Sequence, residues 1–145
     1  MSTYHANEFT LDLPEGLHDK SVQIFALADQ GPSDLSVVVA RERPNPGEAA
    51  LGFANRTLTA LSEQLAVLTV LSKEAIELDG APAIRTDYTW SSSQGKMFQR
   101  QVVAHAAAHD QMLIVTATCR DAMSPRAEAV FSAFLAKFRF RASEA

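Results

Sequence analysis

The sequence predicts an α+β fold in which an antiparallel β-sheet of about six to seven strands packs against two main helices. Two observations support this class. Strand-like segments with period-two alternation or short apolar runs outnumber helical segments, and the 3.6-residue period occurs in one central and one C-terminal segment. The resulting order is three strands, a helix, four strands and a helix. We expect the two helices to cover one face of the sheet and to leave the other face partly open.

Three short strands are predicted before the first helix, at residues 9–13, 21–27 and 35–41, with turns rich in Gly, Pro and Asp between them. In the second of these strands Val22 and Ile24 share one face, and Phe25 lies on the other. In the third strand Val37 and Val39 share a face. Because apolar residues occupy both faces, we expect these strands to be covered on both sides.

The two helices are predicted from apolar stripes with helical spacing. The stripe of the first helix consists of Leu51, Ala54, Leu58, Leu61 and Leu65. The second helix has Ser124 as its predicted N-cap and Pro125 at its first helical position. Its apolar residues are Ala127, Val130, Phe131, Phe134, Leu135 and Phe138.

Four further strands are predicted between the helices, at residues 69–78, 83–90, 96–104 and 112–118. The turn sequences "DGAP" and "SSSQG" separate the first three of these strands. This arrangement is typical of an antiparallel meander.

The chain of 145 residues has the length of one domain, and we expect residues 1–145 to form a single domain. Its 13 basic and 17 acidic residues give a formal net charge of −4, which argues against a nucleic-acid surface. No apolar stretch approaches the roughly 20 residues of a membrane span. The N-terminal sequence shows no export signal, so we expect a cytoplasmic protein.

No constellation of catalytic residues is recognisable, and we expect a protein that is not an enzyme and needs no metal or cofactor. His105 and His109 are four residues apart, as in helical metal sites, but the flanking segments resemble strands and predict a turn. The serines at 91–93 are typical of a hairpin turn. Cys119 is the one cysteine of the chain, and we expect it to be a small packing residue.

Residues 86–103 combine aromatic, apolar and polar side chains in two neighbouring strands. Tyr88 and Trp90 share a face and are expected to pack under a helix. Gln99, Arg100 and Gln101 follow between apolar neighbours. Buried amide and guanidinium groups need hydrogen-bond partners. Two alternatives remain: an internal polar network, or an exposed surface whose polar groups bind a ligand.

A family resemblance covers nearly the whole chain in order. It is carried by "FTLDLPEGLHDKSVQIFAL", "SVVVARERPNPGE", "FANRTLTALSEQL", "DYTWSSSQGKMFQRQ" and "LIVTAT". These segments resemble the DcrB-like family, which has the PsbP-like αβ sandwich fold. More narrowly, they resemble the Eag chaperones that are encoded beside type VI secretion effectors.

The resemblance implies a homodimeric chaperone or adaptor of the bacterial cytoplasm. Such a protein binds the hydrophobic N-terminal transmembrane helices of a type VI secretion effector in a concave sheet groove, and keeps the effector soluble for loading onto the secretion spike. We expect the groove to be the continuous apolar patch Val22, Ile24, Val37, Val39 and Phe98, with Gln99 and Gln101 as polar contacts. The alternatives are a carrier of a small apolar molecule and a PsbP-like adaptor that binds a folded protein unrelated to secretion.

Overall fold

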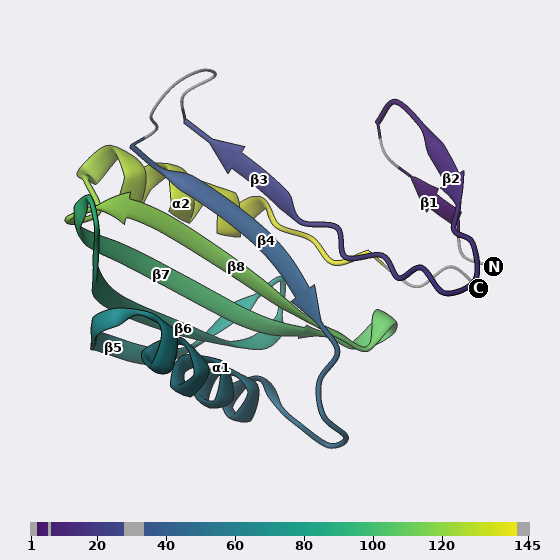
Figure 1. The fold of residues 1–145 in the computed structure, drawn as a ribbon, viewed down its shortest axis with the longest axis horizontal. Helices are drawn as coiled ribbons and strands as arrows, with labels where there is room; N and C mark the ends of the chain where they lie inside the picture. The colour runs from purple at the N-terminus through teal and green to yellow at the C-terminus, as the bar shows by residue number, and fades with distance from the viewer. Residues whose placement is uncertain (1–2, 6, 28–33, 142–145) are drawn as a thin grey trace.

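A computed structural model describes residues 3–5, 7–27 and 34–141 of the chain. Its centre is a six-stranded antiparallel sheet with the strand order β3-β4-β8-β7-β6-β5 (Figure 1). The strands are β3 (Gln23–Ala26), β4 (Ser36–Glu42), β5 (Ala66–Leu78), β6 (Ala81–Ser92), β7 (Gly95–Ala106) and β8 (Gln111–Arg120). The predicted α+β class is confirmed, and β5 to β8 form the predicted meander.

The N-terminal residues form a separate hairpin of two short strands, β1 (Thr3–His5) and β2 (Thr10–Asp12). Figure 1 shows this hairpin beyond the end of the main sheet. The strand predicted at residues 9–13 corresponds to β2, but it pairs with β1 and does not join the main sheet. Alternation of side chains predicts a strand without indicating its partner.

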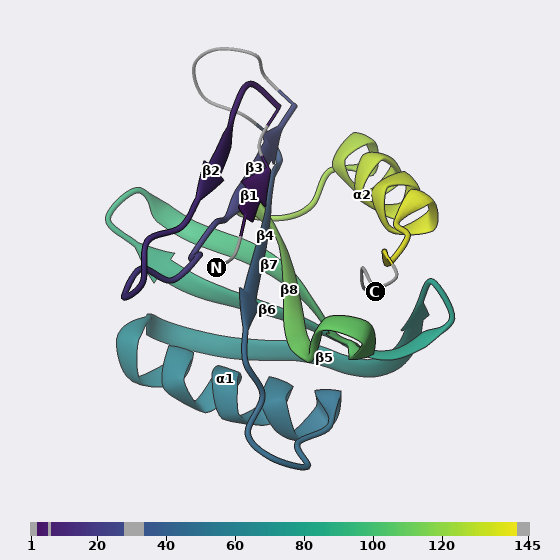
Figure 2. The same ribbon diagram turned by 90° about the vertical axis from the view of Figure 1, so that its right-hand side faces the viewer.

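The helices α1 (Ala50–Gln64) and α2 (Pro125–Lys137) lie on opposite sides of the sheet (Figure 2). Phe53 of α1 belongs to one buried cluster with Val103, and Phe131 of α2 belongs to another with Val102. Val102 and Val103 are neighbours in β7, and successive side chains of a strand point to opposite faces. The expectation that both helices cover one face is therefore wrong. We call the two sides of the sheet the α1 face and the α2 face.

The beginning of α2 follows the sequence prediction. The Ser124 side-chain oxygen accepts a hydrogen bond of 3.1 Å from the backbone N–H of Ala127, and Pro125 occupies the first turn. This cap satisfies one of the N–H groups that lack a partner in the first turn of a helix.

Strand β3 is an edge strand of the sheet and is largely exposed, unlike its neighbour β4. Ile24 is 69% exposed, and Phe25 on the opposite face is 49% exposed. The expectation that residues 21–27 are covered on both sides is therefore wrong, because an apolar strand can also serve as an uncovered edge. The turn predicted after this strand falls largely on residues 28–33, which lie outside the described residues.

Candidate functional site

The α1 face carries a hollow of about 330 Å³ between the C-terminal half of α1 and the sheet. Helix α1 packs over β5, β6 and β7 (Figure 2). The hollow extends from the helix across to β8 and β4. Its lining residues are Val38, Ala40, Thr57, Leu61, Leu65, Tyr88, Trp90, Gln99, Gln101, Ile114, Thr116 and Thr118. We call this surface, together with the neighbouring Ile24, the α1-face groove.

The register of the sheet brings the floor of this groove together. Ile24 pairs with Val38, Val38 with Thr116, and Thr116 with Gln101. Directly paired residues of antiparallel strands share a face. One row across β3, β4, β8 and β7 therefore runs from an exposed isoleucine to a buried glutamine.

Gln99 belongs to a hydrogen-bonded chain that crosses three strands of the floor. The Trp90 indole N–H donates to the Gln99 side-chain oxygen at 3.0 Å, and the Gln99 amide nitrogen donates to the Thr118 hydroxyl at 3.0 Å. Both ends of the Gln99 amide are thus used within the protein. This chain holds the Trp90 ring and the Gln99 side chain in fixed orientations.

Gln101 differs from Gln99, because its side-chain amide makes no hydrogen bond with the described residues although the residue is only 4% exposed. The Tyr88 hydroxyl likewise makes no hydrogen bond with the described residues. Desolvation by burial raises the pKa of Tyr88 to about 12. The phenol therefore stays protonated at neutral pH and can donate. Among the described residues, the Gln23 side-chain oxygen is the one fully buried polar atom without a partner. The polar atoms of Gln101 and Tyr88 therefore keep contact with solvent, and a ligand in the hollow can replace that water with its own hydrogen bonds.

Arg100, between these two glutamines, points to the α2 face and has its partners inside the protein. Its Nη1 donates to Glu128 of α2 at 2.7 Å, and two further nitrogens donate to the Asp87 carboxylate. Of the two alternatives for the polar residues of β7, an internal network therefore holds for Arg100 and Gln99. Gln101 remains available to a ligand.

The predicted apolar patch is split between the two faces of the sheet. Val37, Val39 and Phe98 are 4%, 6% and 8% exposed and belong to the core cluster under α2. Ile24 lies on the α1 face, where the Gln99 and Gln101 side chains also lie. Exposed Val22 lies just before β3, with the parity of Ile24. The expectation of one continuous patch is therefore wrong.

The cause of this error is the register between β3 and β4. Ile24 pairs with Val38, and Val37 pairs with Phe25. A shift of one residue in the pairing moves every side chain of a strand to the other face relative to its neighbour. Alternation along β4 shows that Val38 faces the opposite side from Val37 and Val39. It does not show whether Val38 or one of the other two valines lies beside Ile24.

Sequence reasoning also missed several lining residues. Val38, Thr116 and Thr118 come from β4 and β8, whereas Leu61 and Leu65 come from the stripe of α1 and its C-cap. Tyr88 and Trp90, which were expected to pack under a helix, line the hollow opposite these two leucines. The available signals were the apolar stripe of the helix and the alternation of threonines with apolar residues at 115–119.

The other candidate residues have structural partners. The turn predicted around His105 and His109 is confirmed, because the 3₁₀ turn η1 (Ala107–His109) joins β7 to β8. His105 Nε2 lies 3.1 Å from Asp110 Oδ1, and His109 Nε2 lies 3.0 Å from the Arg141 carbonyl oxygen. Cys119 is buried, and desolvation raises the pKa of its thiol.

The described part of the chain contains neither a metal-binding cluster nor a membrane-spanning helix. No group of three or more His, Cys, Asp or Glu side chains within it could hold a metal ion. Neither of its two α-helices is long and apolar enough to cross a membrane.

Comparisons with known proteins agree with this architecture. The chain is 27% identical over 129 residues to a curated Pseudomonas aeruginosa protein named Effector EagT6, and the match covers 88% of both chains. A crystal structure of a Pseudomonas aeruginosa protein of unknown function has a TM-score of 0.81 at 25% identity, with 99% of each chain covered.

A more distant match concerns the fold alone. The solution structure of cyanobacterial PsbP from Synechocystis has a TM-score of 0.55 at 12% identity, covering 97% of this chain and 92% of that one. The PsbP-like fold expected from the resemblance is thereby confirmed. The DcrB family model matches residues 8–137, which is most of the chain. The chain belongs to the DcrB family.

Proposed function

We propose that this protein is a non-enzymatic chaperone or adaptor that holds an apolar, membrane-type helix of a secreted effector in the α1-face groove. The similarity to a protein named Effector EagT6 supports a role connected with an effector. The resemblance to the Eag chaperones supports a type VI secretion effector as the partner and the cytoplasm as the place of binding. The chemistry of the groove supplies a physical reason for binding an apolar helix.

The observation that carries the proposal is the Gln101 amide, which lies in a mostly apolar floor without a partner among the described residues. A membrane helix in water exposes apolar surface that favours burial. Its small polar residues also need hydrogen-bond partners, as they do between helices in a bilayer. The groove offers both kinds of contact, since Ile24 and Val38 are apolar and the Gln101 amide has no hydrogen-bond partner among the described residues.

One protomer offers only one side of such a site. A helix is about 10–12 Å across with its side chains, and 20 residues span about 30 Å, whereas the hollow measures about 330 Å³. A second copy would supply an opposing surface. We therefore propose a homodimer in which two α1 faces flank the effector helix.

The N-terminal arm, which consists of the β1–β2 hairpin and the segment leading to Val22, also supports a dimer. Its apolar residues Phe9, Leu11 and Leu17 are about half exposed, at 53%, 46% and 60%. The arm leads directly into the exposed edge strand β3. Exposed apolar residues gathered in one segment are typical of an interaction surface.

Capture of a defined helix tests the proposal. The tagged protein is co-expressed with a soluble carrier that bears an N-terminal segment of 20 leucines and alanines with one central serine. We expect the carrier to be retained in a pull-down and the same carrier without the segment to be lost. Ile24→Asp should abolish retention. The control Val130→Asp places the same charge on exposed α2, on the opposite side of the sheet, and should retain the carrier.

The role of Gln101 is tested by exchanging the central serine of the segment for alanine. The wild-type protein should retain the serine segment about fivefold better, as one hydrogen bond of about 1 kcal/mol implies. Gln101→Leu should remove this preference and keep apolar capture. Equal retention of the carrier with and without the segment, or unchanged retention by Ile24→Asp, would refute the groove.

A further inference from the structure

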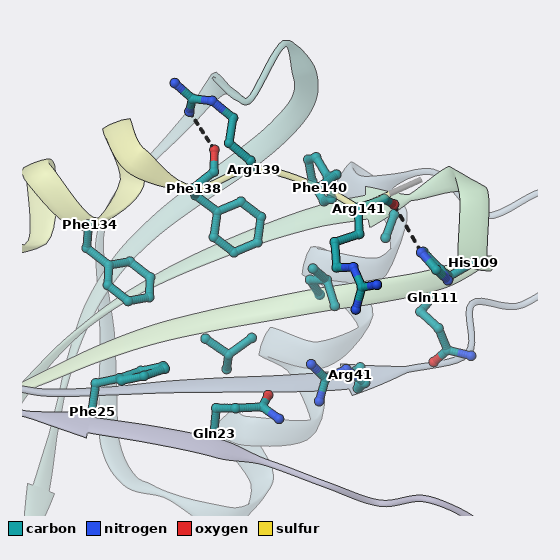
Figure 3. Close-up of a pocket in the computed structure, with 13 residues that line it drawn as sticks. Gln23, Phe25, Arg41, His109, Gln111, Phe134, Phe138, Arg139, Phe140 and Arg141 are labelled. Atoms are coloured by element: carbon teal, nitrogen blue, oxygen red, sulfur yellow. Dashed lines mark hydrogen bonds between the residues drawn. The ribbon is translucent and has the colours of Figure 1, made fainter. Parts of the chain in front are cut away.

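A second and larger hollow, of about 740 Å³, lies on the α2 face (Figure 3). Strands β3, β4 and β8 form one wall, and the end of α2 with the segment that follows it forms the other. Phe25, Phe134, Phe138 and Phe140 line it with their rings. The ring centroids of Phe25 and Phe134 are 5.7 Å apart and those of Phe138 and Phe140 are 5.2 Å apart, so two pairs of aromatic rings line the hollow.

The charged side chains of this hollow all carry the same sign. Arg41, Arg139 and Arg141 belong to the lining, and none of the lining residues is acidic. In Figure 3 the Arg41 and Arg141 side chains point into the hollow from opposite walls, one from β4 and one from the C-terminal segment. His109 Nε2 lies 3.0 Å from the Arg141 carbonyl oxygen and so fastens that segment to η1.

The partners of Arg41 leave most of its donors available. Its Nη1 donates to the Ser21 carbonyl oxygen at 2.9 Å. Asp19 is the nearby acidic group: hydrogen bonds from Ser21 and, to a smaller extent, the charge of Arg41 lower the pKa of its carboxyl, against the effect of burial. No carboxylate of the described residues lies within 4.0 Å of the Arg41 nitrogens.

Gln23 adds a polar group that lacks a partner. Its side-chain oxygen is fully buried and makes no hydrogen bond with any residue that the structure describes. The two ends of a glutamine amide are nearly interchangeable in shape. A half-turn of the amide would present its NH₂ group, which donates, at the same place. A bound acceptor would thus satisfy Gln23 and could accept from Arg41 as well.

From this geometry we infer that the α2-face hollow binds a small anionic amphiphile, namely a single-chain carboxylate with an apolar body. The carboxylate lies between Arg41 and Arg141, and the body lies along the phenylalanine rings. Guanidinium groups bind carboxylates through charge-assisted hydrogen bonds. The volume lies within the range of about 300–1,000 Å³ that is usual for small-molecule sites. This site is independent of the proposed groove on the other face.

Calorimetric titration of the full chain with sodium decanoate, below its micelle concentration, tests the inference. We expect saturable binding with one decanoate per chain. Decyltrimethylammonium has the same tail and the opposite charge, and should not bind. Arg41→Gln should weaken decanoate binding by about tenfold or more, as loss of a charge-assisted hydrogen bond implies.

Arg139→Gln is the matched control for loss of a positive charge. Arg139 donates to the carbonyl oxygens of Ala136 and Phe138, and Figure 3 shows its guanidinium group turned away from the hollow. We expect its decanoate affinity to stay within about twofold of the wild type, and Ile24→Asp on the other face to behave likewise. Thermal melts establish that each variant is folded.

Three results would overturn the inference: no binding at millimolar decanoate, equal binding of the cationic amphiphile, or equal weakening by Arg41→Gln and Arg139→Gln. The last result would indicate attraction by general surface charge. Loss of decanoate binding in Ile24→Asp would also count against a separate site. Failure of helix capture with normal decanoate binding would refute the proposed function alone.

Discussion

Arg100 of β7 and Asp87 of β6 are paired across neighbouring strands, and the guanidinium donates two hydrogen bonds of 3.0 and 3.1 Å to the carboxylate. Both side chains are more than 90% buried. A third bond, to Glu128, connects this pair to α2. Arg100 and Asp87 therefore satisfy each other inside the protein, whereas Gln101, the next residue of β7, has no side-chain partner among the described residues.

Arg100→Met is predicted to destabilise the protein strongly, because it leaves the Asp87 carboxylate buried without its main partner. Loss of one member of a buried ion pair costs about 3–5 kcal/mol. Urea unfolding followed by circular dichroism measures this change. Arg85→Met is the control, since Arg85 also binds Asp87 but is 28% exposed, and its loss should cost less. Equal effects of the two substitutions would contradict the central role of Arg100.

The same pair predicts how stability depends on acid. Burial alone would raise the pKa of Asp87, but hydrogen bonds from Arg100 and Arg85 outweigh it and hold the pKa below its usual value. A carboxyl whose pKa is lowered by folding stabilises the protein above its unfolded pKa of about 3.9 and loses this effect as the pH falls through the folded pKa.

Urea midpoints between pH 7 and pH 2.5 test this acid dependence. We expect the contribution of Asp87 to be constant above about pH 5 and to disappear at lower pH. Asp87→Asn should reduce stability at pH 7, and the difference between variant and wild type should narrow as the pH falls below 4. A constant difference over the whole range would refute the assignment.

An aspartate is predicted to affect stability very differently at Ile24 of β3, on the α1 face, and at Val39 of β4, on the α2 face. Ile24→Asp adds a charge at an exposed position and should change the free energy of unfolding by no more than about 0.5 kcal/mol. Val39→Asp buries an unpaired charge under α2 and should cost several kcal/mol. Thermal melts of the two variants measure the difference. Comparable melting temperatures would mean that the register of β3 against β4 is not the one described.

The proposed dimer predicts that the N-terminal arm affects assembly. Light scattering at tens of micromolar should give twice the mass of one chain for the wild type, and a lower mass for the double variant Leu11→Asp, Leu17→Asp, because charges there oppose burial against a partner. Val67→Asp, on the exposed edge strand β5, serves as the control and should remain dimeric. A monomeric wild type would contradict the dimer.

The elements that depend on neighbours along the chain could be read from the sequence. The stripe from Leu51 to Leu65 predicted α1, and Ser124 with Pro125 predicted where α2 begins. The turns between β5, β6 and β7 predicted the meander. In each case the signal is local, since helix periodicity, capping and hairpin turns depend on residues a few positions apart.

The composition of the site was likewise visible, because Gln99, Arg100 and Gln101 stand out among apolar neighbours. Their alternation implies that Arg100 faces away from the two glutamines, but not which face is covered by which helix. The tertiary structure decided this by placing Glu128 and Asp87 around Arg100.

The pairing of distant segments was decided only by the tertiary structure. Ile24 lies beside Val38 and not beside Val39, and α1 and α2 lie on opposite faces. Both strands are apolar on both faces, so either register would bury valines, and local preference does not distinguish them. The choice depends on the simultaneous packing of Val37 and Val39 under Phe131, far along the chain, which leaves Ile24 and Gln101 on the α1 face.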